Sequence, residues 1–404
     1  MTASPDRDAP WRRTVEAAGL LGTDGVVHPT VFARLSALAA ERGAINLGQG
    51  FPDYDGPPEV LDAARAAIAE GANQYPPGRG IRELRVAIAE HQRRFRGLEW
   101  DPDSEVLVTA GATEAIAASL LALVGRDDEV VVVEPYYDSY AALVGLAGGR
   151  LVTVPARAPS FLPDPDELVA AISDRTAVIL LNSPHNPTGA MLPAETLTAV
   201  VAAAERHDAV VVSDEVYEHL AYDPGTPHVS LASIPGARER GITVSSAAKT
   251  FRVTGWKIGW ITAPAPLLEA VLAVKQFLTY VNGAPFQPAV ARGLALPDSY
   301  FRDSAADLAA RRDTVRDALV AAGFAVSHPP GGYFLVADGT PLGLPDATVA
   351  ATRLLDEAGV VAIPVTAFTT RANAASYAPL LRVAFCKRAD VIAEAAARLA
   401  AFAR

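Results

Sequence analysis

The sequence predicts an α/β fold, with a mainly parallel sheet between layers of helices and a smaller α+β domain beside it. Between residues 105 and 245, short apolar segments alternate with longer segments of helical periodicity, which is the pattern of successive β–α–β units. The segments 130–133 and 210–212 are runs of valine, and strands that are apolar on both faces belong to parallel sheets covered by helices on both sides. After about residue 297 one long helical segment is followed by short strands, which predicts the second domain.

The composition is that of a globular protein, and the charge limits the classes of partner. The chain has 404 residues, of which 50% are hydrophobic, enough for one large core and a smaller one. Lys and Arg number 35 against 46 Asp and Glu, a net charge of -11, so neither nucleic acid nor an anionic membrane is expected as a partner. The single cysteine, Cys386, excludes an internal disulfide and a cysteine-based zinc cluster. Because no apolar segment reaches membrane-spanning length and no signal-peptide core is present, a soluble cytoplasmic protein is expected.

Residues 1–56 are expected to form an N-terminal arm and part of the small domain. Residues 1 to about 26 mix charged residues with Pro and Gly and are expected to be poorly ordered. Apolar residues at helical spacing predict a helix over 30–42, which Gly43 ends. A short strand over 45–50 then leads into a turn-rich loop over 51–58.

Residues 57–297 are expected to form the large domain, and residues 298–404 the small C-terminal domain. Helices are predicted over 59–70 and 80–94. The alternation that follows predicts strands over 105–109, 129–134, 150–154, 177–181, 209–213 and 242–245, and helices over 112–124, 139–147, 164–172 and 193–207. The small domain is predicted to contain helices over 303–322 and 389–401, and short strands near 325, 333–336, 360–364 and 381–385.

Ligands of open α/β sheets bind beyond the carboxyl ends of the strands, so the residues that follow each strand are candidates. Gly111, Ala112 and Thr113 open a helix, where free backbone amides make an anion site; an ordinary capped helix is the alternative. Tyr136 and Tyr137 follow the next strand. An aromatic residue there could stack on a planar ring, or could belong to the core.

Two further strand ends carry polar residues. The segment 182–189, Asn-Ser-Pro-His-Asn-Pro-Thr-Gly, has two amides in a proline-rich loop, which could donate to a ligand oxygen; a purely structural turn is the alternative. Asp214 ends a strand predicted to be buried, where a carboxylate is unfavourable without a positive partner. Its alternative role is a helix cap.

Lys249 lies in the segment 245–260, where glycines are expected to interrupt any long helix or strand. Its neighbours are small or apolar, and desolvation lowers the pKa of a lysine and makes it a nucleophile for a carbonyl carbon. A solvated lysine in a loop is the alternative. Ser246 and Lys257 add a hydroxyl and a charge suited to a phosphate. Together, these strand ends offer an anion site, an aromatic ring, amides, a buried acid and a buried lysine. These features match the chemical groups of pyridoxal phosphate.

These motifs resemble those of the fold type I, class I aminotransferases along nearly the whole chain after residue 28. The most specific are Asn-Pro-Thr-Gly at 186–189, Asp-Glu-Val-Tyr at 214–217 and Ser-Ala-Ala-Lys-Thr-Phe at 246–251. The resemblance implies pyridoxal phosphate as the cofactor, with no metal at the site. Where many members have an arginine for the phosphate, this chain has Lys257, as does the kynurenine/glutamine aminotransferase subgroup, whose Gly-Trp-Lys-Ile-Gly-Trp run it shares at 255–260.

The resemblance also implies roles for individual residues. Lys249 would bind the aldehyde of the cofactor, Asp214 would pair with the ring nitrogen, and Tyr137 would stack on the ring. Asn186 and Tyr217 would bind the phenolic oxygen, with the 186–187 peptide bond in the cis form. The phosphate would be held by Gly111, Ala112, Thr113, Ser246, Lys257 and, across the interface of a homodimer, Tyr75.

The substrate carboxylate would be bound by Arg382, Gly50 and Asn186. An arginine solvated at a strand end is the alternative for Arg382. Phe32 and Tyr333 could line the side-chain pocket or belong to the core.

Within the family, the resemblance is closest to actinobacterial N-succinyldiaminopimelate aminotransferases of lysine biosynthesis, with glutamate as the expected donor. Shared stretches lie at 49–53, 73–78 and 283–288. Kynurenine or glutamine transamination and β-elimination from cysteine S-conjugates are alternatives on the same site. A non-catalytic regulator is a remote alternative, since the first 28 residues are too few for a helix-turn-helix domain.

Overall fold

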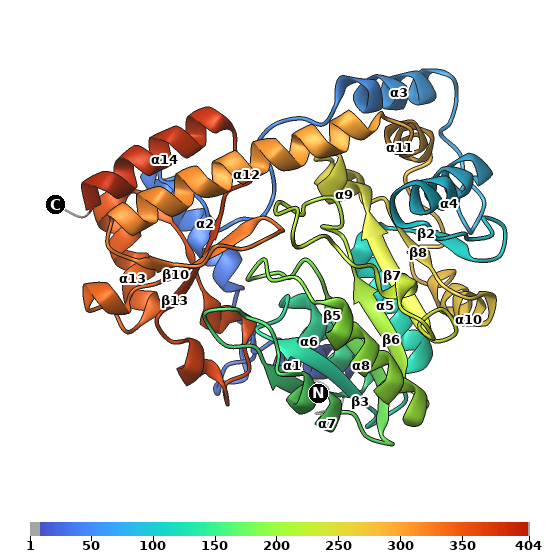
Figure 1. The fold of residues 1–404 in the computed structure, drawn as a ribbon, viewed down its shortest axis with the longest axis horizontal. Helices are drawn as coiled ribbons and strands as arrows, with labels where there is room; N and C mark the ends of the chain where they lie inside the picture. The colour runs from blue at the N-terminus through green and yellow to red at the C-terminus, as the bar shows by residue number, and fades with distance from the viewer. Residues whose placement is uncertain (1–8, 403–404) are drawn as a thin grey trace, which may run out of the picture.

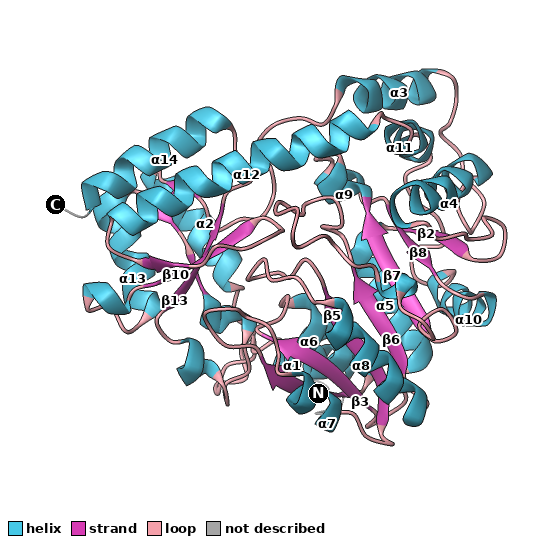
Figure 2. Ribbon diagram, viewed as in Figure 1, coloured by secondary structure: helices cyan, strands magenta, loops and turns pink. Residues whose placement is uncertain are grey.

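The computed structural model describes residues 9–402, and its largest sheet has seven strands (Figures 1 and 2). Strand β8 is antiparallel to both its neighbours, while the other six run in one direction. The predicted mainly parallel sheet is therefore confirmed. In spatial order the strands are β2 (Val106–Thr109), β8 (Gly259–Thr262), β7 (Gly241–Ser246), β6 (Val210–Asp214), β5 (Thr176–Asn182), β3 (Glu129–Glu134) and β4 (Arg150–Pro155).

Helices cover both faces of this sheet, as the runs of valine predicted. In β3, Val130 and Val132 belong to one apolar core, whereas Val131 and Val133 belong to the core on the opposite face. This alternation follows from the period of two along a strand. The first core contains residues of α5 (Gly111–Leu123), α6 (Ser139–Ala147) and α10 (Ala265–Lys275), and the second contains residues of α7 (Pro165–Ala170) and α8 (Ala194–Arg206).

A third core forms where α3 (Pro58–Ala69), α4 (Arg82–Arg96) and α11 (Phe286–Leu294) pack against β2 and β8. As expected, no long helix or strand lies within residues 245–260, and Gly259 begins β8, which has four residues. A Cβ atom on Gly259 would lie 2.6 Å from the carbonyl carbon of Gly111. Glycine at this position therefore allows two backbones to approach closely within the sheet.

The C-terminal part of the chain forms a four-stranded antiparallel sheet beside two long helices. Helix α12 (Asp298–Ala321) packs along α14 (Ala389–Phe402), and Figure 1 shows both on the same side of the sheet. Although α12 has 24 residues, neither it nor any other helix among residues 9–402 is apolar and long enough to cross a membrane. The strand order is β12 (Ile363–Pro364), β13 (Leu380–Ala384), β10 (Phe334–Asp338) and β9 (Ala325–Val326), with α13 (Ala347–Arg353) alongside.

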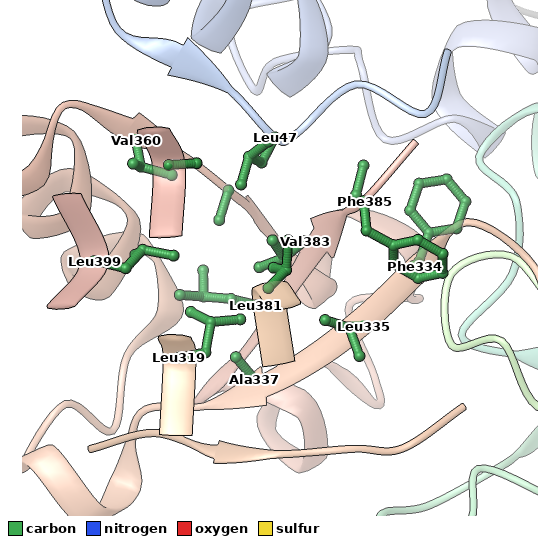
Figure 3. Close-up of a cluster of buried hydrophobic side chains, with 14 of the residues drawn as sticks. Leu47, Leu319, Phe334, Leu335, Ala337, Val360, Leu381, Val383, Phe385 and Leu399 are labelled. Carbon is green, nitrogen blue, oxygen red and sulfur yellow. The ribbon is translucent and has the colours of Figure 1, made fainter. Parts of the chain in front are cut away.

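The N-terminal segment packs against this C-terminal part. The predicted helix is present as α2 (Val31–Arg42), capped by the Thr30 side chain and ended by Gly43 in a left-handed conformation. Strand β1 (Ile45–Asn46) is shorter than predicted and pairs with β11 (Val360–Val361). The strand expected over 360–364 is consequently two strands with different partners. Leu47 then enters the core formed around β10 and β13 (Figure 3).

The expectation that residues 1 to about 26 are poorly ordered is wrong for α1 (Pro10–Ala17), while residues 1–8 lie outside the described residues. This helix packs on α6. The contact is close because Gly145 has no side chain: a Cβ atom there would lie 2.7 Å from the Cβ of Ala17. Pro10 at the first helical position is the sequence signal for the start of this helix.

Candidate active site

A cavity of about 460 Å³ lies at the carboxyl edge of the seven-stranded sheet. Strand register brings its polar residues together, because Asn182 pairs with Asp214 and Ser246 pairs with Gly259 at the ends of adjacent strands. Gly259 also pairs with Thr109, just before α5 begins. The volume is typical of a small-molecule site.

Twelve of the thirteen predicted site residues line this cavity. The exception is Tyr75, which is 84% exposed and is not among the lining residues. Phe32 lines the cavity, whereas Tyr333 is buried behind it. The predicted residues that the cavity brings together are Gly50, Gly111, Ala112, Thr113, Tyr137, Asn186, Asp214, Tyr217, Ser246, Lys249, Lys257 and Arg382.

Lys249 projects into the cavity from α9 (Ala247–Thr250), a short helix whose first turn is capped by the Ser246 side chain. Its Nζ donates to the carbonyl oxygen of Gly50 at 3.2 Å, and its own carbonyl accepts from the Tyr333 hydroxyl at 3.1 Å. Burial lowers the pKa of this amine. A larger fraction of the neutral, nucleophilic form is therefore present than for an exposed lysine.

Asp214, the last residue of β6, is buried at the floor of the cavity. Its Oδ2 accepts from the Tyr140 hydroxyl at 2.7 Å, and its Oδ1 accepts from the Val216 amide at 3.3 Å. Burial raises the pKa of Asp214 to about 6, although these two hydrogen bonds oppose the shift. A positive group beside the carboxylate would stabilise its ionised form.

A second part of the cavity is suited to an anion. Gly111 begins α5 with a φ of 77°, in the left-handed region that favours glycine. A Cβ atom on Gly111 would lie 3.5 Å from Nζ of Lys257. The start of a 13-residue helix and a lysine amine therefore lie side by side, and Ser246 lines the same cavity. Asn282 supports this arrangement by donating to the carbonyl oxygen of Lys257 at 2.7 Å.

Arg382 extends from β13 into the cavity with neutral hydrogen-bond partners. It donates to Oδ1 of Asn186 at 3.0 Å and to the carbonyl oxygen of Gly48 at 2.6 Å. Its Nε is buried and has no partner among residues 9–402. The rings of Phe334 and Phe368 lie 4.1 and 4.5 Å from the guanidinium carbon. Burial lowers its pKa to about 10, so the group remains charged at neutral pH and can bind a carboxylate.

Three supporting residues were not assigned their observed roles from sequence. Asn182 donates to the carbonyl of Asp214 at 2.8 Å and accepts from the amide of Asn186 at 2.7 Å, so it fixes one residue beside the other. Tyr140 binds Asp214 from within α6, where the sequence gives no signal to distinguish it from a core tyrosine. Tyr333 binds the backbone of Lys249.

The peptide bond between Asn186 and Pro187 is cis, which confirms the cis form predicted for the 186–187 bond.

Comparison with known proteins gives a consistent set of relatives. A family model described as aminotransferase class I and II matches residues 42–399. A Mycobacterium tuberculosis protein described as a probable N-succinyldiaminopimelate aminotransferase, DapC, is 50% identical, covering 93% of this chain and 96% of that protein. A solved structure of N-succinyldiaminopimelate aminotransferase from M. tuberculosis has a TM-score of 0.89 at 51% identity, covering 93% of this chain and 97% of that one.

Two relatives described by other substrates are less similar. An Escherichia coli methionine aminotransferase is 39% identical and covers 92% of this chain and 95% of its own. A kynurenine–oxoglutarate transaminase 3 of Mus musculus is 34% identical and covers 89% of this chain and 84% of its own. By sequence identity, this chain is therefore more similar to the M. tuberculosis protein than to either of these two relatives.

Proposed function

We propose that this chain, which belongs to the pyridoxal-phosphate-dependent class I and II aminotransferases, acts on N-succinyl-diaminopimelate and its 2-oxo acid. Glutamate is the proposed partner amino acid, and lysine biosynthesis the proposed pathway. The observation that supports this choice is the 50% identity with the M. tuberculosis protein over 93% of this chain.

The residues of the cavity fit pyridoxal phosphate. Gly111 and Lys257 form an anion site of the kind a phosphate needs. Asp214 is a buried carboxylate that a positive ring nitrogen would stabilise. Asn186 and Tyr217 line the cavity with groups that can bind a phenolic oxygen, and Tyr137 offers an aromatic face.

When bound, the cofactor supplies a carbonyl group that takes up the amino group and a ring that withdraws electrons from the substrate Cα. The chain supplies the acid–base chemistry. Nζ of Lys249, whose pKa is lowered by burial, is the proposed nucleophile and the proposed carrier of the Cα proton. Asp214 is proposed to keep the ring nitrogen protonated. Arg382 is proposed to orient the substrate through its carboxylate.

The substrate assignment can be tested with the purified protein loaded with cofactor and with glutamate as the amino donor. Initial rates are measured over a panel containing the 2-oxo acid of N-succinyl-diaminopimelate and those of methionine, kynurenine and glutamine. The highest kcat/KM is expected for the succinylated compound. Higher kcat/KM for one of the others would contradict the proposed substrate. Pyruvate release from a cysteine S-conjugate tests the β-elimination alternative.

Replacing Arg382 with alanine is expected to raise KM for every amino donor, with little change in cofactor absorbance. A hydrogen bond to a charged group contributes about 1.5–3 kcal/mol, which corresponds to a rise in KM of roughly 10- to 160-fold. The measurement is steady-state kinetics with at least two amino donors of different side chain.

Arg382→Lys is the matched control, because it keeps the charge and loses the paired geometry of the guanidinium. An intermediate KM is expected. Two results would show that a different group binds the carboxylate. One is unchanged kinetics of Arg382→Ala with all donors. The other is that Arg382→Ala loses the cofactor, while the protein that remains active has a normal KM.

We also propose that the active unit is a homodimer in which Tyr75 reaches the cofactor phosphate of the neighbouring subunit. Tyr75 is 84% exposed and contacts Tyr280, whose ring centre is 5.9 Å away. Phe277 and Leu278 are exposed nearby in the chain, at 84% and 47%. Exposed apolar side chains gathered in this way are typical of a protein interface. A two-fold contact would use the same surface on both subunits, so one loop could complete both sites.

Tyr75→Phe is expected to weaken cofactor retention by about 1.5–3 kcal/mol, because one hydrogen bond to a charged phosphate is lost. The loss is measured as the dissociation constant of pyridoxal phosphate, by dialysis and absorbance. Light scattering of the holoenzyme at assay concentration tests the assembly directly. A fully active monomer, or unchanged cofactor affinity in Tyr75→Phe, would contradict the shared site.

The proposed compartment is the cytoplasm. The one cysteine of the chain, Cys386, is an unpaired thiol in the core. Reduced thiols are typical of cytoplasmic proteins. Fractionation of the source cells with an antibody against the protein would test this proposal.

A further inference from the structure

A second group of titratable side chains lies outside the active site, between α4 and the turn that follows β6. His91 comes from α4, and Glu218 and His219 from that turn. One potential ligand atom of each residue lies within 4.8 Å of the other two. The two Nε2 atoms are only 2.7 Å apart. One imidazole must therefore donate and the other accept, so at least one ring has an unprotonated Nε2, whose lone pair could bind a metal ion in place of the other ring.

From this geometry we propose that His91, His219 and Glu218 bind one divalent transition-metal ion of the zinc class. Two imidazoles and one carboxylate are a ligand set that zinc accepts, with bonds of about 2.0–2.2 Å. A tetrahedral ion with such bonds separates its ligand atoms by roughly 3.4 Å. The two Nε2 atoms, at 2.7 Å, are closer together than that, and all three ligand atoms lie within 4.8 Å of one another. Small rotations of the side chains would therefore suffice.

The surrounding residues hold the carboxylate and the rings in place. Oε1 of Glu218 accepts from the Ser245 hydroxyl at 2.6 Å, whereas Oε2 accepts two longer hydrogen bonds, each of 3.4 Å, from the side chains of Gln92 and Arg96. Arg96 lies 3.4 Å from Oε2, but its shorter hydrogen bond, 2.8 Å, goes to the carbonyl oxygen of Glu218. Arg96 can thus stay bound to the backbone while the carboxylate turns to a metal. Such partners commonly orient the ligands of a metal ion.

One further feature favours an ion at this position. A cavity of about 410 Å³ is lined by Glu218 and His219, among others, and shares no lining residue with the active-site cavity. An ion could enter from this side, and a water molecule there could supply a fourth ligand.

The proposal is tested on the full-length protein saturated with pyridoxal phosphate and treated with a chelator that is then removed. Zn²⁺ is titrated by calorimetry, and Co²⁺ is added separately to follow the visible absorption of a four-coordinate ion. One Zn²⁺ per chain is expected for the wild type. His91→Phe and His219→Gln are each expected to weaken binding by at least about tenfold, since even loss of an outer partner weakens metal affinity by this much.

Phenylalanine is chosen at 91 because His91 already packs against the ring of Phe95, at 4.9 Å. His219→Gln changes a half-buried residue and keeps the test valid if the first variant does not fold. His207→Gln is the matched control, because His207 pairs only with an exposed aspartate, Asp174, among residues 9–402. Unaltered Zn²⁺ affinity in both cluster variants, or no stoichiometric binding by the wild type, would overturn the proposal.

Discussion

Lys249→Ala is expected to abolish turnover while the protein remains folded. The variant lacks both the proposed nucleophile and the proposed carrier of the Cα proton, and loss of acid–base catalysis alone corresponds to about 10²–10⁴-fold in rate. Folding should be little affected, because the amine makes one hydrogen bond, to the carbonyl of Gly50, among residues 9–402. The ammonium form is also unfavourable in this buried position, as its lowered pKa indicates. The measurement is transamination from glutamate, with thermal unfolding in parallel.

Lys249→Arg serves as the control for charge. It retains a cation at this position, yet a guanidinium stays protonated at neutral pH and cannot act as the nucleophile. Both variants are therefore expected to be inactive, and both are expected to lose the absorbance typical of cofactor bound to a lysine. A rate near that of the wild type in either variant would show that another group carries the chemistry.

Most of the site residues that the sequence predicted lie at or just beyond the carboxyl end of a strand. Because parallel strands end at the same edge of a sheet, Tyr137, Asn186 and Asp214 could be expected from the sequence alone to converge. The runs of valine identified the buried strands, and so located their ends. Arg382 does not follow this rule. It comes from the four-stranded sheet, and only the family resemblance pointed to it.

The residues that were missed depend on contacts between distant segments. Tyr140 binds Asp214 from the buried face of a helix, and an apolar helix with one tyrosine gives no sign of that hydrogen bond. His91 and His219 are 128 positions apart, and neither lies in a recognisable metal-binding spacing. The role of Gly259 also depends on distant segments, because glycine can either interrupt a strand or admit a second backbone, and the neighbouring sequence does not distinguish these two uses. Only the tertiary structure, which brings Gly111 against it, decides between the two.

Asp214→Asn is expected to leave the cofactor bound and to slow removal of the Cα proton by roughly 10³-fold. Two unit charges 4 Å apart interact by about 4 kcal/mol at an effective dielectric constant of 20, and a neutral amide loses that attraction to a protonated ring nitrogen. The fold should be retained, because asparagine has the same shape and its carbonyl oxygen can still accept the hydrogen bond from Tyr140 or Val216.

The relevant measurement is the half-reaction with glutamate, followed by the absorbance of the cofactor in a stopped-flow instrument, so that substrate release does not obscure the proton transfer. Tyr140→Phe provides a graded control. It removes the 2.7 Å hydrogen bond that opposes the rise in the pKa of Asp214, but it keeps the carboxylate. A smaller loss of rate than in Asp214→Asn is therefore expected, since one hydrogen bond to a charged group contributes about 1.5–3 kcal/mol. If the asparagine variant reacted as fast as the wild type, Asp214 would have no electrostatic role, and burial of its carboxylate would need another explanation.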